Sequence, residues 1–68
     1  MPTISMFFGI IIRMFADDHN PPHFHAIYQE YEATFDLDGK MMEGEMPSKQ
    51  EQLIKAWALI HKEELEAN

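Results

Sequence analysis

"YEATFDLDGK", residues 31–40, contains the clearest strand and the clearest turn of this sequence. Apolar and polar side chains alternate through it, as expected for a strand with one face in a core. The apolar positions are Tyr31, Ala33, Phe35 and Leu37, and the polar positions between them are Glu32, Thr34 and Asp36. The Asp38-Gly39 pair predicts a tight primed turn, because glycine accepts positive φ, so a short returning strand should begin at Met41.

Two further stretches upstream have the same alternation. Residues 4–14 predict one long strand with Ile4, Met6, Phe8, Ile10, Ile12 and Met14 on one side. Gly9 leaves a second interpretation open, two strands joined by a bend, since an isolated glycine in a strand pattern often marks a break. Residues 23–29 alternate again. These stretches together predict an antiparallel meander of three to four strands.

The pattern changes to helical spacing at Ser48. "SKQE", residues 48–51, fits a capping box in which Ser48 and Glu51 each bind a backbone amide, and Pro47 prevents an earlier start. One apolar face then follows, made of Leu53, Ile54, Trp57, Ile60, His61 and Leu65. We therefore expect an α+β fold in one domain, residues 1–68, a small antiparallel β-meander packed by one C-terminal α-helix.

Size and charge narrow the classes of function. A chain of 68 residues without cysteine has neither disulfides nor thiolate metal sites, so its stability is expected to come from packing, a histidine-bound metal or a partner subunit. The formal charge of −7 opposes binding to nucleic acid, which needs lysine and arginine to neutralise phosphates. No stretch is long and apolar enough for a membrane helix or resembles a secretory signal. We expect a cytoplasmic protein that forms homodimers or binds a small protein partner.

Three of the four histidines lie in "DDHNPPHFHAIY", residues 17–28. His23 and His25 are two residues apart on a predicted strand, so their imidazoles share a face. His19, or a carboxylate from Asp17 or Asp18, could add a third ligand and complete an open site for Zn²⁺ or Ni²⁺.

Two other interpretations of His19, His23 and His25 stay open. The imidazoles titrate near neutral pH and could act as catalytic acid and base on a phosphodiester such as RNA. Arg13 is the only arginine available for the charge that develops in that reaction, which counts against a nuclease. The histidines could also simply hydrogen-bond loop carbonyls and hold the turn.

Other candidate residues have structural interpretations. His61 is expected to be a satisfied core histidine, with recruitment to the histidine cluster as the alternative, and Trp57 is expected to anchor the core. The acidic positions are expected to form a solvated surface or a patch that meets a basic partner. They are Glu30, Glu32, Asp36, Asp38, Glu43, Glu45, Glu63, Glu64 and Glu66.

The segment "DHNPPHFHAIY", with "GEMP" further along and Trp57, His61 and Glu64-Leu65 in the helix, resembles the small bacterial family known as domain of unknown function 4160. Members usually continue past the helix, so this chain is expected to be C-terminally short. The resemblance implies no established activity and no catalytic residue. It implies a neighbouring small gene and a role in toxin–antitoxin-like pairs.

Two functional classes follow from the sequence. The favoured one is a small acidic interaction module that binds a cognate protein or itself. The alternative is a histidine-centred metalloprotein or RNA-cleaving enzyme that uses His19, His23 and His25.

Overall fold

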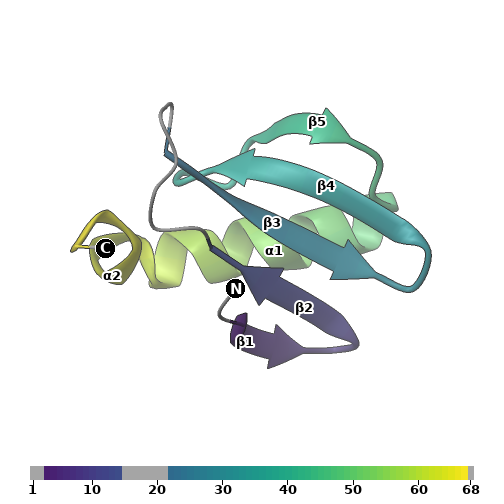
Figure 1. Cartoon of the computed structure of the whole chain (residues 1–68), viewed down its shortest axis with the longest axis horizontal. Coiled ribbons are helices and arrows are strands. Elements are labelled where there is room, and N and C mark those ends of the chain that lie inside the picture. Colours follow the sequence, from purple (N-terminus) through teal and green to yellow (C-terminus); the bar gives the residue numbers. More distant parts are fainter. Residues whose placement is uncertain (1–2, 15–21, 68) are drawn as a thin grey trace.

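The computed structural model describes residues 3–14 and 22–67, with side chains described for residues 5–14 and 22–65. Five strands form one antiparallel sheet in sequence order, and a helix lies along one face of it (Figure 1). The elements are β1 (Thr3–Phe7), β2 (Ile10–Arg13), β3 (His23–Tyr28), β4 (Tyr31–Asp36), β5 (Met41–Gly44), α1 (Ser48–Ile60) and α2 (Lys62–Ala67). The predicted α+β meander is confirmed, with five strands instead of three to four.

The first alternating stretch is a hairpin, so the interpretation as one long strand is wrong and the alternative of two strands joined at Gly9 is confirmed. Phe7 pairs with Ile10, so Phe8 and Gly9 form a two-residue turn with φ of 49° and 79°, as primed turns require. Residues paired across a hairpin point to the same face, so Phe7 shares the face of Ile10. On one continuous strand, two residues three apart in the sequence would point to opposite faces. The inward side of β1 is therefore the opposite of the predicted one. Met6 and Phe8 are 70% and 77% exposed.

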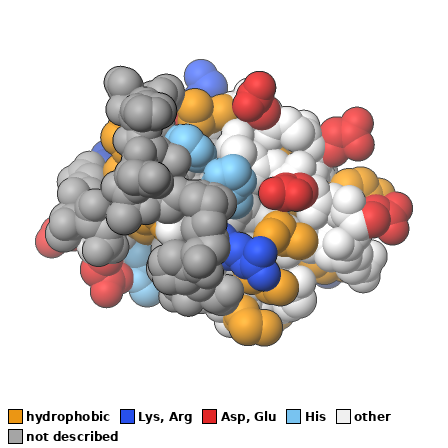
Figure 2. Space-filling model, in the orientation of Figure 1, with side chains coloured by type: hydrophobic (Ala, Val, Ile, Leu, Met, Phe, Trp, Pro, Cys, Tyr) orange, Lys and Arg blue, Asp and Glu red, His pale blue; other side chains and the backbone are white. Residues whose placement is uncertain are grey.

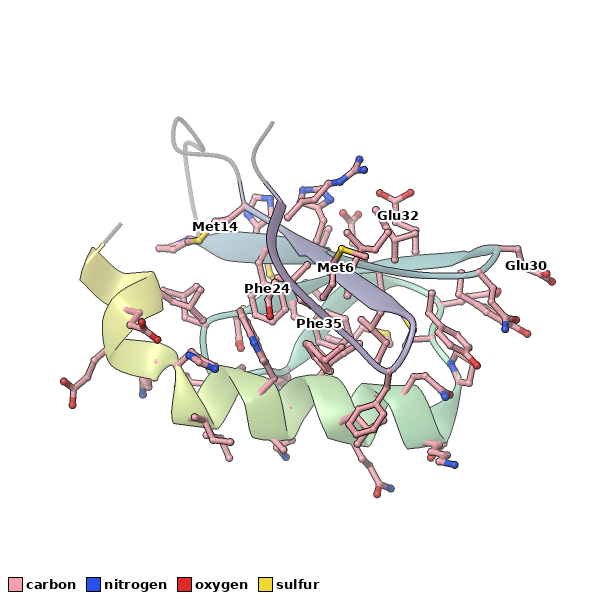
Figure 3. All side chains as sticks on the ribbon, turned by 90° about the horizontal axis from the view of Figure 1, so that it is seen from below. Met6, Met14, Phe24, Glu30, Glu32 and Phe35 are labelled. Atoms are coloured by element: carbon pink, nitrogen blue, oxygen red, sulfur yellow. The ribbon has the colours of Figure 1, made fainter. Side chains whose placement is uncertain are left out.

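The central hairpin β3–β4 agrees with the predicted alternation. Tyr28 pairs with Tyr31 across a two-residue turn. Phe24 and Phe35 are paired neighbours, fully buried, and their rings stack at 5.6 Å. Figure 3 shows both of them between the sheet and the helix. This hairpin therefore supplies the centre of the core.

The turn between β4 and β5 differs from the predicted primed turn. Gly39 N–H donates to the Asp36 carbonyl, and Gly39 alone among residues 37–40 has positive φ, 87°. This is the arrangement of a type I turn followed by a left-handed residue. The Asp36 carboxylate accepts the backbone N–H groups of Asp38 and Lys40, both at 2.9 Å. The returning strand begins at Met41, as predicted.

The predicted capping box does not form at the start of α1. Pro47 occupies the cap position without a side-chain hydrogen bond, and Ser48 is the first helical residue. Glu51 N–H donates to the Pro47 carbonyl instead. Pro47 does mark the start of the helix, as predicted, because a helix tolerates proline at its first turn only.

The predicted single long helix is interrupted at His61, where φ is −106° and ψ is 16°. Ile54 and Ala58 are the buried residues of α1, while Ile60, predicted on the apolar face, is 77% exposed. Leu65 of α2 is buried, as predicted. Neither helix in the described ranges is long and apolar enough to span a membrane.

The core fills the space between the sheet and the helices. Its buried residues are Ile10, Ile12, Phe24, Ala26, Ala33, Phe35, Met46, Ile54, Ala58 and Leu65.

Trp57 anchors α1 to this core, as the sequence predicts. Its ring stacks on Phe7 at 6.0 Å and meets the edge of Phe24 at 5.4 Å, and its Nε1–H donates to Ser5 Oγ at 3.1 Å. One side chain thus ties the helix to both β1 and β3.

Candidate functional site

The sheet has a second face, turned away from α1, that none of the described elements covers (Figures 1 and 3). Because side chains alternate along strands, it carries the residues between the core positions. In Figure 3 Glu32 projects from this side, opposite Phe24 and Phe35. We call it the outer face. It comprises Met6, Ile11, Arg13, His23, His25, Ile27, Glu32, Thr34, Asp36 and Glu43.

The strand register arranges these side chains in rows that cross the sheet. One row is largely apolar and consists of Met6, Ile11, Ile27 and Glu32. The next row is polar and consists of Arg13, His25, Thr34 and Glu43. Directly opposed side chains on neighbouring strands have Cβ atoms about 4.5–5.5 Å apart, so members of a row are in contact range. The outer face therefore combines an apolar strip with charged and titratable groups.

His23 and His25 lie together on the outer face. Both are half-buried, and Phe24 between them enters the core. Their ring centres are 5.2 Å apart and the ring planes are tilted by 53°. Figure 2 shows two histidine side chains next to one another on this side of the molecule. The predicted shared face of the two imidazoles is confirmed, and their convergence on one ion stays a prediction.

Glu32 is an acidic residue that lies beside this pair. Its Oε2 lies 3.8 Å from Nδ1 of His25, and its side chain is 63% exposed. On the other side of His25, Arg13 is the paired residue of β2. His25 thus lies between an acidic residue on β4 and a basic residue on β2.

Asp36 is the residue opposite His23 in the register. Its Oδ1 already accepts two backbone N–H groups of the β4–β5 turn. That carboxylate oxygen therefore stabilises the β4–β5 hairpin by binding two backbone donors.

The predicted third ligand lies outside the described residues, since His19, Asp17 and Asp18 belong to the segment 15–21. Among residues 5–14 and 22–65, no group of three histidine, cysteine, aspartate or glutamate side chains could hold a metal ion. The described part of the candidate site therefore supplies two imidazoles, and the three-ligand site stays a prediction.

His61 lies on the other side of the sheet. Its ring packs 5.0 Å from that of Trp57, and its Nδ1 contacts the carboxylate of Glu64. The side chain is 40% exposed, so it is satisfied by a partner, as predicted, but is not a core residue. Because Trp57 packs on the inward-facing Phe24, the sheet separates His61 from the outer-face histidines.

The acidic residues do not act as one uniform surface. Asp38 binds Lys62 Nζ at 2.6 Å and so ties the β4–β5 turn to the first residue of α2. Glu64 pairs with His61 in the same region. Glu32 and Glu43 lie on the outer face, where they are exposed to a partner or an ion.

A sequence model described as Domain of unknown function (DUF4160) matches residues 9–68. The chain belongs to this family. The match spans β2 to α2 and so includes the whole of the hairpin that carries His23 and His25. Searches of curated proteins and of solved structures found no match. Membership in DUF4160 confirms the resemblance and assigns no activity.

The apolar strip of this DUF4160 chain is the feature that sequence reasoning missed. Ile11 and Ile27 alternate with core residues along β2 and β3. The alternation pattern assigned the opposite face of each strand to the core. The signal in the sequence was an isoleucine at a strand position where the alternation predicts a polar, solvent-facing residue. It indicates a face that is apolar without being covered by the chain's own helix.

Proposed function

We propose that this chain is a protein-binding module whose outer face docks a small basic protein. The observation that carries the proposal is the apolar strip of Met6, Ile11 and Ile27 beside a polar row on a sheet face that no described element covers. Protein interfaces have this composition, an apolar centre with a polar rim that remains accessible to water.

The negative charge of the chain favours a basic partner. The formal charge is −7, and Glu32 and Glu43 sit at the ends of the two rows. Opposite charge on a partner speeds association and fixes its orientation. A second copy would bring the same negative charge to this face, so the outer face suits a different protein better. A small cognate protein, as in the toxin–antitoxin-like pairs that the family resemblance implies, fits this description.

RNA cleavage is less well supported by the same face. Binding and cleaving a phosphodiester require cations close to the phosphate. The two outer-face rows contain one guanidinium, Arg13, against the carboxylates of Glu32 and Glu43. This balance favours a cationic ligand over a polyanion.

The test is a binding titration with the protein encoded next to this chain's gene. Ile27→Lys places a charge in the apolar strip and should weaken binding about 30-fold, equivalent to a hot-spot loss of about 2 kcal/mol. Ile60→Lys is the matched control, because Ile60 is an exposed isoleucine on α1, 77% accessible, and should leave affinity within about twofold. Added salt should weaken binding of the wild-type chain.

Circular dichroism of both variants checks that the fold is retained. Equal affinities of the Ile27→Lys and Ile60→Lys variants would place the interface elsewhere. An affinity that does not fall with salt would contradict a basic partner.

A further inference from the structure

We propose that His23 and His25 form a two-histidine clamp for one divalent transition-metal ion, Zn²⁺ or Ni²⁺. This goes beyond protein binding, since it assigns a cation site to two side chains on a single strand. The proposal depends on four observations about the pair: its ring separation, its placement on the sheet, the carboxylate beside it and the charge of the surroundings.

The ring separation matches the separation that two ligands of one ion require. A Zn–N bond is about 2.0–2.1 Å long, and an imidazole centre lies about 1.1 Å behind its nitrogen, so tetrahedral geometry puts the two ring centres about 5.2 Å apart. The centres of the His23 and His25 rings are 5.2 Å apart. The backbone therefore already holds the rings at the spacing of a chelate.

The placement on β3 keeps this spacing fixed. β3 is the central strand and is paired along its length with β4 and, from His25 onward, with β2. Phe24 and Ala26, the inward neighbours of the two histidines, are fully buried. A site on a strand held by core packing on one side and by pairing with β4 along its length, and with β2 from His25 onward, loses little freedom when an ion binds.

Glu32 lies close enough to His25 to become the outer partner that metal-bound histidines usually have. A histidine ligand typically directs its second ring nitrogen to a carboxylate, which orients the ring and makes it a better donor. Glu32 Oε2 lies on the Nδ1 side of His25, at 3.8 Å. A rotation of the exposed Glu32 side chain would bring its carboxylate into hydrogen-bond range of Nδ1, which would direct Nε2 of His25 to an ion.

The charges around the pair favour a cation over an anion. Arg13 faces His25 from β2, while Glu32 and Glu43 belong to the same two rows on β4 and β5. The chain as a whole carries −7, so its potential concentrates cations. Neutral imidazole nitrogens suit zinc and nickel. Two imidazoles leave further coordination positions to water or to a donor from a bound molecule.

The experiment is calorimetric titration of the untagged chain with zinc chloride and, separately, nickel chloride. We expect one ion per chain for the wild type. His23→Asn and His25→Asn should each weaken binding at least tenfold, and the double variant should show no binding at this site. His61→Asn is the matched control and should bind as the wild type does, because His61 lies on the other side of the sheet.

Imidazole NMR signals of the wild type give a second readout that does not depend on any variant folding. Nickel should broaden the signals of His23 and His25 and leave those of His61 sharp. Three results would each overturn the clamp: no heat with either metal, binding that survives in a folded double variant, or broadening that spares His23 and His25.

Discussion

At the scale of single residues, positive φ values close all three of the described hairpins. Phe8 and Gly9, Gln29, and Gly39 adopt them. The two glycines are visible in the sequence as turn signals. Phe8 and Gln29 are not, because residues with a side chain adopt this conformation only where the paired strands on both sides impose it.

Gly39 has a second constraint besides its φ of 87°. A Cβ placed there would lie 2.9 Å from Cα of Lys55 on α1. Gly39→Ala should therefore lower the free energy of unfolding by about 2–5 kcal/mol, since about 1–2 comes from the left-handed conformation and about 1–3 from overpacking. Urea denaturation measures the change.

Gly9→Ala is the matched control for this substitution. Gly9 has a similar φ of 79°, but its nearest neighbour would be a Tyr28 ring carbon at an ordinary 3.5 Å. Only the conformational part should remain, about 1–2 kcal/mol. Equal losses of unfolding free energy in Gly39→Ala and Gly9→Ala would mean that the close contact between the β4–β5 turn and α1 adds no cost of its own.

At the scale of elements, α1 shows how a helix start depends on more than its local motif. "SKQE" contains the side chains of a capping box, yet the chain enters the helix one residue earlier, with Pro47 at the cap. The proline has φ of −59° and ψ of 147°, which is the extended geometry of a cap residue. Ser48 is then already helical and cannot serve as the cap.

Ser48→Ala should consequently change the free energy of unfolding by less than about 0.5 kcal/mol, whereas loss of a true cap typically costs about 1 kcal/mol. Chemical denaturation followed by Trp57 fluorescence measures it. Ile54→Val, at a fully buried position of the same helix, should cost about 0.5–1.5 kcal/mol and shows that the assay resolves such changes. A loss near 1 kcal/mol for Ser48→Ala would mean that the serine hydroxyl does cap the helix in solution.

At the scale of the whole molecule, the fold is a two-layer structure with one sheet face packed and two sheet edges, β1 and β5. β5 carries Glu43 and a register irregularity where it pairs with β4, features that discourage pairing with another chain. β1 has the sequence TISMF, without a charged side chain. The β1 edge is therefore the more suitable site for self-association.

We expect the free chain to form a dimer by pairing β1 with a second copy, with a mass about twice its 8.0 kDa. Light scattering coupled to size-exclusion chromatography measures this. Met6→Lys adds a charge to the edge strand at a residue that is 70% exposed, and it should yield monomers. Ile27→Lys, on the central strand β3, should remain dimeric. A wild-type chain that elutes as a folded monomer would refute the expected dimer.

The sequence by itself determined the class of the fold and the shared face of His23 and His25. Both follow from alternation, because a strand places residues two apart on the same side wherever it lies. The amphipathic pattern of residues 31–37 and the helical spacing after Pro47 are likewise local, so β4, the helical region and their order could be predicted without any long-range contact.

Tertiary structure decided which face of β1 and which residues of the last helical turns became the inside. The hairpin at Phe8-Gly9 reversed the inward side of β1, so Phe7 and not Met6 meets Trp57. The break at His61 redirected the last turn and left Ile60 exposed while Leu65 is buried. The apolar strip on the outer face arose the same way, since one helix can cover only one side of a sheet. Those outcomes depend on how the chain turns and how its elements pack against one another, and local periodicity carries no information about either.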